Sequence, residues 1–224
     1  MTLTRRTGIT MRVVRSEHGE TRDALARDWP VLLERLGRVY GFAPEWFPLP
    51  NMGEDSVALA RRYGIRALLL TGGDDRGATP DRDLTEEALL RWAAGERLPV
   101  LGICRGAQML ARQAGAALIA VHPGRHVAAR HRIVWNTDGN GGSFWNSALA
   151  ARDAEEVNSF HRWGLSGTAL PANLHAVAVC PEDGSVEAFC HVSLPWMGIF
   201  WHPERETTPR ESDMAILRHL FAEA

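Results

Sequence analysis

The chain has 224 residues, 45% of them hydrophobic, so it can bury one substantial core, and we expect a single domain over residues 1–224. Its 25 basic and 27 acidic residues give a formal charge of -2, which disfavours binding to nucleic acid or to an anionic membrane and favours small-molecule partners. The sequence contains neither a run of roughly 20 apolar residues nor the apolar core of a signal peptide at its start, so we expect a cytoplasmic protein.

Strand-like and helix-like segments alternate along the first half of the chain. Apolar residues recur at three- and four-residue spacings in the first helical segment, which Gly41 is suited to end. Strands are expected at residues 11–14, 45–47, 66–70 and 99–103, and helices at 21–39, 54–63, 84–94 (with Thr85 as its cap) and 106–114. This alternation predicts an α/β fold with a mostly parallel sheet and crossover helices.

The second half has a different pattern. Residues 174–179 and 185–190 flank the turn-forming segment 181–184 and predict an antiparallel hairpin. An apolar strand at 197–201 follows, and a closing helix at 212–222 has Ser212 as its expected cap. The glycine-rich stretch 138–142 is a candidate lid over a functional site.

Cys104 is the first candidate catalytic residue. It follows an apolar strand and precedes a helix, and Gly102 and Gly106 flank it, as in a nucleophile elbow. The start of a helix lowers a thiol pKa and favours the nucleophilic thiolate, and the backbone N–H of Arg105 would point toward a developing oxyanion. The pattern is equally compatible with a small buried cysteine, and Cys180 and Cys190 carry no such motif, nor does any CxxC pair predict a disulfide.

His202 and Glu204 favour the catalytic interpretation, because a thiol nucleophile needs a base and the base needs an orienting carboxylate. His202 comes at the end of an apolar strand. We expect Pro203 to keep the segment extended, so that Glu204 approaches one imidazole nitrogen while the other faces Cys104.

Three stretches, GICRGAQ (102–108), VNSFH (157–161) and GIFWHPE (198–204), resemble class I glutamine amidotransferase-like proteins, especially their free-standing gamma-glutamyl hydrolase branch, typified by gamma-glutamyl-gamma-aminobutyrate hydrolases. The resemblance covers about residues 66–206. It implies a flavodoxin-like three-layer α/β fold, with the hairpin extending the sheet, and a Cys104, His202 and Glu204 triad. It also implies an oxyanion hole from the backbone of Gly73 and Arg105.

The same resemblance implies substrate-binding residues. Gln108 lies one helical turn after Cys104, where its amide could reach a glutamyl group, and a surface helix position is the alternative. Ser159 and Phe160 would hold the amino-acid end of the substrate through an irregular backbone, or Phe160 could belong to the core. His161 and the Arg105 side chain are further candidates to meet substrate charge, and a solvated Arg105 is the alternative.

We expect no cofactor and no metal. The histidines at 122, 126 and 131 have spacings that suit a ligand pair only on a helix, and Pro123 with Gly124 is expected to disrupt one there.

The expected activity is cysteine-dependent hydrolysis of a gamma-glutamyl amide. The absence of a fused synthetase favours hydrolysis over ammonia transfer, whereas Arg162 and Trp163 stand where gamma-glutamyl-gamma-aminobutyrate hydrolases usually have a further His. The end of the third motif resembles a subgroup of nucleotide-linked and capsule pathways that includes hydrolases of gamma-glutamyl-CDP-amidate type. A glutaminase subunit serving a partner synthetase, a non-catalytic glutamyl-binding protein and a cysteine peptidase or chaperone-like relative remain alternatives, as does a homodimer. Loops over 124–142 would face the leaving amine, whose identity the sequence does not encode.

Overall fold

The computed structural model describes residues 4–136, 144–149 and 154–222. In chain order its elements are β1 (Thr7–Thr10), β2 (Arg12–Arg15), β3 (Thr21–Ala24), α1 (Asp28–Tyr40), β4 (Trp46–Leu49), α2 (Glu54–Arg62), β5 (Ala67–Leu70), α3 (Pro80–Glu96), β6 (Val100–Ile103), α4 (Arg105–Gln113), β7 (Ile119–Ala120), α5 (Pro123–His126), β8 (Val127–Trp135), β9 (Glu155–Phe160), β10 (Trp163–Ser166), β11 (Leu174–Val179), β12 (Ser185–His191), β13 (Trp196–Ile199), a 3-10 helix (Pro203–Arg205) and α6 (Glu211–Phe221). The expected lid, residues 138–142, lies outside the described residues.

One large sheet organises the fold, in the order β4-β1-β5-β6-β13-β12-β11-β8-β9. Strands β4, β1, β5, β6 and β13 are parallel, whereas every pairing from β13 to β9 is antiparallel. The expected mostly parallel sheet and the β11–β12 hairpin are therefore confirmed. The antiparallel part is larger than a hairpin, because β8 and β9 extend it.

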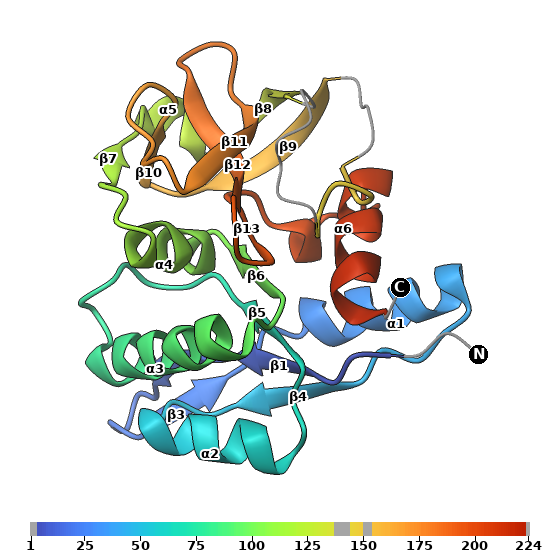
Figure 1. The fold of residues 1–224 in the computed structure, drawn as a ribbon. Helices are drawn as coiled ribbons and strands as arrows, with labels where there is room; N and C mark the ends of the chain where they lie inside the picture. The colour runs from blue at the N-terminus through green and yellow to red at the C-terminus, as the bar shows by residue number, and fades with distance from the viewer. Residues whose placement is uncertain (1–3, 137–143, 150–153, 223–224) are drawn as a thin grey trace.

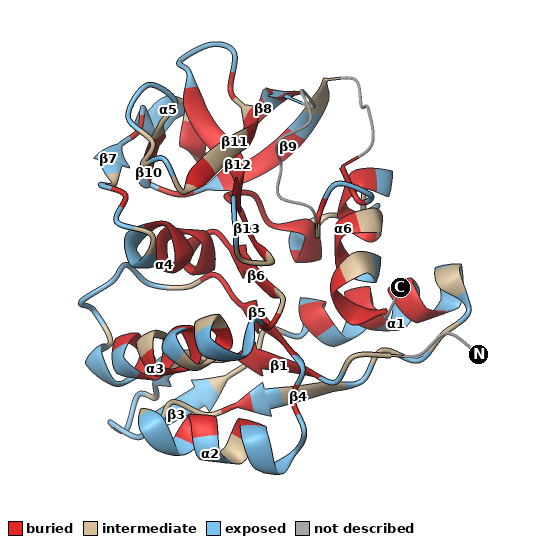
Figure 2. Cartoon of the chain, in the orientation of Figure 1, coloured by how far each residue is buried: buried red, intermediate tan, exposed pale blue. Residues whose placement is uncertain are grey.

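Helices cover both faces of the parallel part. Helices α1 and α6 contact each other on one face, and α2, α3 and α4 form a row on the other (Figure 1). Strand β5 serves both sides: Leu69 belongs to the core shared with α1 and α6, while Leu68 and Leu70 belong to the core under α2 to α4. Figure 2 shows that burial follows the central strands and the inner faces of these helices. The three layers match the sequence-based expectation.

Several expected boundaries are wrong. Residues 11–14 and the start of the expected 21–39 helix form a separate two-stranded hairpin, β2–β3, and the first strand of the large sheet is β1. The first helix begins only at Asp28, although Gly41 ends it in the left-handed conformation as expected. The sequence near residues 21–24 is strand because cross-strand pairing with β2 outweighs its weak helical pattern.

Two expected caps are also corrected. The third helix begins at Pro80, a residue suited to the first helical position, so Thr85 lies inside it and its hydroxyl donates to the carbonyl of Asp81. The closing helix begins after Arg210, and the Ser212 hydroxyl donates to Glu155 on β9. In both cases the hydroxyl donates to an oxygen and does not accept from the free backbone N–H groups at the start of its own helix.

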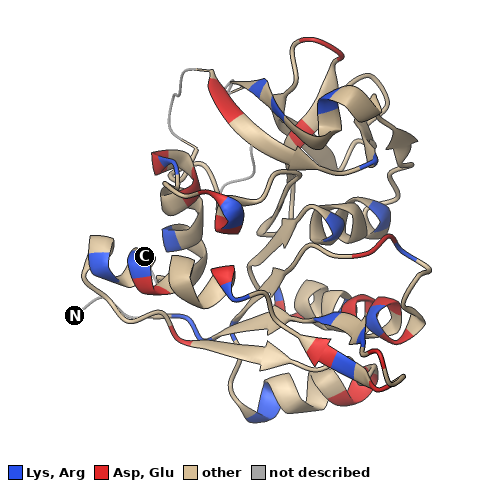
Figure 3. Ribbon diagram, turned by 180° about the vertical axis from the view of Figure 1, so that it is seen from behind, with Lys and Arg blue, Asp and Glu red and all other residues tan. Residues whose placement is uncertain are grey.

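Charges of both signs are interspersed over the face shown in Figure 3, in line with the small formal charge of -2. Within the described ranges, no helix is long and apolar enough to cross a membrane.

Helix α4 packs unusually close to the strands beneath its N-terminus. A Cβ at Gly106 would lie 2.2 Å from the carbonyl oxygen of Leu70 on β5, and one at Gly102 would lie 2.5 Å from the backbone of Gly106. Both contacts are with main chain, which cannot rotate away as a flexible side chain can. The two glycines that flank Cys104 therefore leave no room for a Cβ.

Gly106→Ala should therefore lower the free energy of unfolding by about 1–3 kcal/mol, because the added methyl group forces α4 away from β5. Gly95→Ala is the matched control: Gly95 is an exposed residue of α3 with open space around its Cβ position, and alanine there should stabilise by about 0.5–1 kcal/mol. Urea denaturation of both variants measures the difference. Equal stabilities would contradict the close packing at Gly106.

Candidate active site

Three parallel strands end side by side at the candidate site. In their register Leu70 of β5 is next to Gly102 of β6, and Ile103 of β6 is next to Ile199 of β13. Because the carboxyl ends of parallel strands meet at one edge of the sheet, the segments that follow them converge. The 72–73 loop, Cys104 and His202 are brought together in this way.

Cys104 occupies the turn between β6 and α4. Its φ of 51° and ψ of -103° place it at positive φ, where residues other than glycine are uncommon. Its backbone N–H donates to Ile199 at 2.8 Å and its carbonyl accepts from Gln108 at 3.0 Å, so the turn is fixed on both sides. The strained turn and the start of α4 together form the strand–turn–helix arrangement expected for a nucleophile.

His202 and Glu204 form a buried pair. The Nδ1 atom of His202 lies 2.6 Å from Oε1 of Glu204, and the two side chains are almost wholly inaccessible to solvent. The expectation that Pro203 keeps this segment extended is wrong. The segment forms a short 3-10 helix directly after His202. That turn brings the carboxylate back to the ring two residues earlier.

The electrostatics of His202 link it to Cys104 as well. Burial acts to lower the pKa of His202, but the charge of Cys104 and hydrogen bonds with Cys104 and Glu204 outweigh it and raise the pKa to about 9. Since Nδ1 is engaged by Glu204, Nε2 is the nitrogen left for Cys104. The arrangement favours an imidazolium at His202 near neutral pH.

Gly72 and Gly73 accommodate this pair and its support. A Cβ at Gly72 would lie 2.5 Å from Cε1 of His202, and one at Gly73 would lie 2.1 Å from Nη1 of Arg82. Arg82 in turn donates to the carbonyl of Gly72 at 3.2 Å and to that of Thr71 at 2.7 Å. The buried guanidinium of Arg82 thus fixes the loop that contains Gly73, the candidate oxyanion donor.

Arg105 is neither solvated nor directed at substrate, which corrects both interpretations of its side chain. It is 1% exposed and pairs with Glu86 and Asp83, two carboxylates of α3. Glu86 also accepts from Arg82, at 2.9 Å. Only the backbone N–H of Arg105 remains a candidate for contact with a reacting group.

Asn158 is a site residue whose role the sequence did not reveal, although it lies within one of the three motifs. Its amide oxygen accepts from the backbone N–H of His202 at 2.9 Å, and its amide nitrogen donates to the carbonyl of His202 at 2.8 Å and to Glu206 at 2.7 Å. This side chain holds the main chain of the candidate base from both sides. The VNSFH motif marked Asn158 as part of a segment that carries the resemblance, but the spacing of residues in a sequence does not identify the hydrogen-bond partner of an asparagine.

The structure divides the expected substrate residues into two groups. Phe160 is 41% exposed and its ring lies 5.7 Å from that of His202, so it borders the candidate site rather than the core. Gln108 is nearly buried, and its amide donates to the carbonyl of Trp163 at 3.1 Å. Ser159 donates its hydroxyl to His126, and the buried His161 ring faces Glu187. The side chains of Ser159 and His161 are therefore engaged elsewhere, and their backbone groups are what a substrate could meet.

Comparisons with known proteins agree with this geometry. The sequence model of the Peptidase C26 family matches residues 47–204, a span that contains the elbow and the histidine–glutamate pair. A gamma-glutamyl-CDP-amidate hydrolase of Campylobacter jejuni subsp. jejuni serotype O:2 is 28% identical over 223 residues, which cover 96% of each chain. A gamma-glutamyl-gamma-aminobutyrate hydrolase of Escherichia coli O157:H7 is 30% identical over 162 residues, covering 66% of this chain and 61% of the relative.

A solved structure supports the fold. A protein of Thermoplasma acidophilum described as a putative GMP synthase component superposes with a TM-score of 0.64 at 21% identity, covering 96% of this chain and 91% of its own. At this identity the likeness speaks for the α/β architecture alone.

The His202 environment gives a titration that can be measured. In the wild type the ring should titrate with a pKa of about 9, followed by NMR of labelled histidine. Cys104→Ala and Glu204→Gln should each lower this pKa, because each removes a partner that stabilises the imidazolium while burial remains. His122→Gln, at an exposed histidine, is the control and should leave it unchanged. A His202 pKa that is the same in all four proteins would contradict the coupling.

Asn158→Ala should lower the free energy of unfolding by about 1–3 kcal/mol, because the buried N–H and carbonyl of His202 lose their partner. Asn146→Ala, at an exposed asparagine, should change stability by less than about 0.5 kcal/mol. Chemical denaturation measures both. If Asn158→Ala lowers the free energy of unfolding no more than Asn146→Ala does, the backbone of His202 is held by other contacts.

Proposed function

Because this chain belongs to the Peptidase C26 family, we propose that it is a cysteine-dependent hydrolase of gamma-glutamyl amide bonds, with Cys104 as nucleophile, His202 as acid and base, and Glu204 as the carboxylate that orients the base. The observation that carries the proposal is the single site in which a cysteine at positive φ, a buried histidine and its carboxylate are coupled. The hydrolase names of the relatives agree with it.

In the first half-reaction the Cys104 thiolate attacks the γ-carbonyl carbon of the substrate. A carbon–sulfur bond forms, the carbon–nitrogen bond breaks, and the imidazolium of His202 gives its proton to the departing amine nitrogen. A γ-glutamyl thioester on Cys104 remains. The pKa of about 9 at His202 keeps this proton available across the physiological range.

In the second half-reaction water attacks the thioester. His202, now neutral, takes a proton from that water, the carbon–sulfur bond breaks, and L-glutamate leaves as the thiolate and the imidazolium are restored. Glu204 stabilises the imidazolium at Nδ1 and keeps Nε2 directed at the reacting atoms throughout. No other reactant than water is needed.

Backbone groups would stabilise the oxyanion. The N–H of Arg105 at the start of α4 and that of Gly73 after β5 are the two donors, since both segments are fixed by the buried network of Arg82 and Glu86. For the glutamyl group we assign Gln108 together with the backbone of Ser159, Phe160 and His161. Their placement around strand β9 and the start of α4 supports this assignment.

A nucleotide-linked amine is the proposed leaving group. The relative that matches along nearly the whole chain is named for gamma-glutamyl-CDP-amidate, whereas the gamma-aminobutyrate relative aligns over 66% of it. The exposed Phe160 ring beside His202, with the Arg205 guanidinium 4.5 Å from its centroid, offers an aromatic and cationic surface at the mouth of the site.

Glutamate release from three substrates tests this function: gamma-glutamyl-CDP-amidate, gamma-glutamyl-gamma-aminobutyrate and glutamine. The wild type should have its highest kcat/KM on the first. Cys104→Ala should reduce kcat by roughly 10⁴-fold or more on every substrate, because the covalent route is lost. Cys180→Ser, a change at a buried cysteine remote from the triad in sequence and bound to Glu182, is the matched control.

Two outcomes would decide against the proposal. Equal glutamate release by the wild type and Cys104→Ala would remove Cys104 as nucleophile. Turnover of glutamine that rises sharply only in the presence of a co-purifying synthetase would favour the alternative of a glutaminase subunit.

A further inference from the structure

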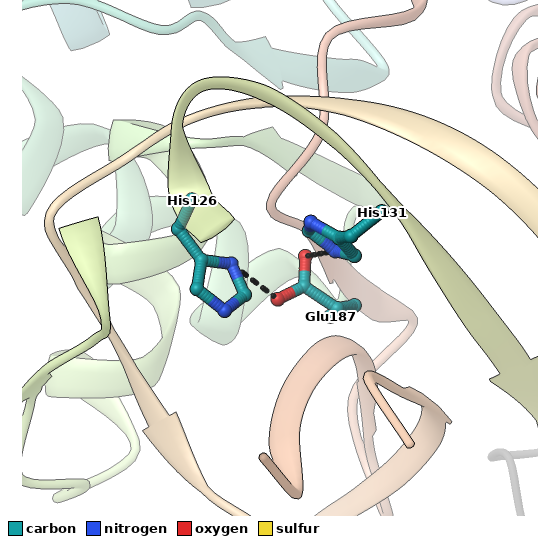
Figure 4. A group of neighbouring side chains, drawn as sticks. All are labelled: His126, His131 and Glu187. Carbon is teal, nitrogen blue, oxygen red and sulfur yellow. Dashed lines mark ion pairs between the residues drawn. The ribbon is translucent and has the colours of Figure 1, made fainter. Parts of the chain in front are cut away.

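A second cluster of titratable side chains lies on the far side of strand β9 from His202. Glu187 of β12 is fully buried, and three histidines surround it: His126 at the end of α5, His131 on β8 and His161 directly after β9. The distances to its carboxylate are 3.4 Å from His126 Nδ1, 3.4 Å from His131 Nε2 and 3.5 Å from His161 Nε2. Figure 4 shows the His126 and His131 rings on either side of the carboxylate, each turning one nitrogen toward it.

The atoms that face one another here lack hydrogen bonds. His126 Nδ1, His131 Nε2, His161 Nε2 and Glu187 Oε2 are all buried without a hydrogen-bond partner within the described part of the chain. A buried polar group left unsatisfied costs about 1–3 kcal/mol, so four of them converging on one point require an explanation.

The opposite nitrogen of each ring fixes its tautomer. His131 Nδ1 lies 3.3 Å from the carbonyl of Arg125, and His161 Nδ1 lies 3.2 Å from that of Trp163. A carbonyl only accepts, so both Nδ1 atoms carry the proton and a neutral ring has its lone pair on Nε2. In the same way His126 donates Nε2–H to Asp183 at 2.8 Å, which leaves its lone pair on Nδ1. All three lone pairs therefore point at the carboxylate.

Protonation alone does not resolve this arrangement. One imidazolium would neutralise Glu187 but leave two lone pairs facing it. Further protonation would place like charges close together in the interior, since the His126 ring centroid lies 4.6 Å from that of His131 and 4.9 Å from that of His161. A divalent cation bound by His126, His131 and Glu187, whose ligand atoms lie within 4.8 Å of one another, satisfies three of these atoms at once.

We propose that His126 Nδ1, His131 Nε2 and Glu187 form a binding site for one zinc ion, and that His161, whose Nε2 lies 3.5 Å from Glu187, moves in as the fourth ligand when the ion binds. Ligand atoms at 2.0–2.1 Å from a tetrahedral zinc lie about 3.3–3.4 Å apart, which is close to the nitrogen–oxygen distances here. The ligand atoms of His126, His131 and Glu187 all lie within 4.8 Å of one another, so the histidine rings draw in slightly as the ion binds. Three imidazoles and a carboxylate suit zinc, and outer partners such as Asp183 orient the ligands.

The expectation of no metal near these histidines rested on helical spacing. Pro123 is the first residue of the short helix α5, so it starts a helix there instead of preventing one. His122 is exposed and takes no part, whereas Glu187 of β12 and His161, directly after β9, come from far along the chain. The ligand set could not be recognised because sheet pairing, not helical spacing, assembles it.

A second grouping, His126 with Cys180 and Asp183, is the competing position for an ion. Its atoms are already satisfied: Asp183 accepts from His126 at 2.8 Å and from the Ser185 hydroxyl at 2.7 Å, and the Cys180 thiol donates to Glu182 at 3.0 Å. We therefore assign Asp183 to orienting His126 and leave Cys180 outside the site.

Metal content and cobalt spectroscopy test the site on the full chain with no affinity tag. The protein purified in metal-free buffer should hold about one zinc per chain by mass spectrometry, and the stripped protein should bind Co²⁺ with the strong visible absorption of a tetrahedral site. His131→Gln should abolish both signals, and Asp183→Asn should weaken zinc binding by about 10–100-fold. His122→Gln and Cys180→Ser should behave as wild type.

If His131→Gln fails to fold, metal binding by the stripped wild type still decides the test. A stripped wild type that is folded by circular dichroism, yet binds neither Zn²⁺ nor Co²⁺ at micromolar concentration, would overturn the proposal in favour of an ion-paired cluster. Loss of metal in Cys180→Ser would overturn the ligand assignment. Cys104→Ala should bind zinc as the wild type does and should be equally stable. That result would show that the metal site does not depend on the proposed hydrolysis.

Discussion

The close approach of helix α4 to strands β5 and β6 is the constraint on which the candidate site depends. The chain can turn from β6 into α4, with α4 packed this close to β5, only because Gly102 and Gly106 have no side chain. The same approach forces Cys104 to positive φ, a conformation that the packed surroundings must maintain. In return Cys104 is held at the N-terminus of a helix, where the aligned peptide dipoles place positive partial charge.

A buried ionic network supports that turn from the α3 side. Burying Arg82, Arg105, Glu86 and Asp83 costs desolvation free energy that ion pairing only partly offsets, so the network is a poor source of stability by itself. What it does supply is position: Arg82 fixes the carbonyls before Gly73, and Arg105 ties the first residue of α4 to α3. Both backbone N–H groups proposed for the oxyanion hole thus lie on segments anchored to the same carboxylate, that of Glu86.

The sequence was sufficient wherever a local pattern decides the structure. The apolar strand before Cys104, the flanking glycines and the 174–190 hairpin followed from spacing and composition alone. It was insufficient where distant segments meet. Asn158 is hydrogen-bonded to His202, which lies 44 residues away in the sequence. Arg105 pairs with Asp83 and Glu86 on another helix. Neighbouring residues in the sequence do not reveal such partners.

Strand β9 explains how the candidate catalytic pair and the histidine cluster come to be neighbours. Successive side chains of a strand point to opposite faces, so Asn158 and Phe160 share one face and Ser159 and His161 the other. The first face meets the backbone and ring of His202, and the second meets His126 and Glu187. A shift of one residue in the register of β9 would exchange these faces and lose both sets of contacts. An ion bound on the second face would fix that register and, through it, the position of His202, the proposed catalytic base, on the first.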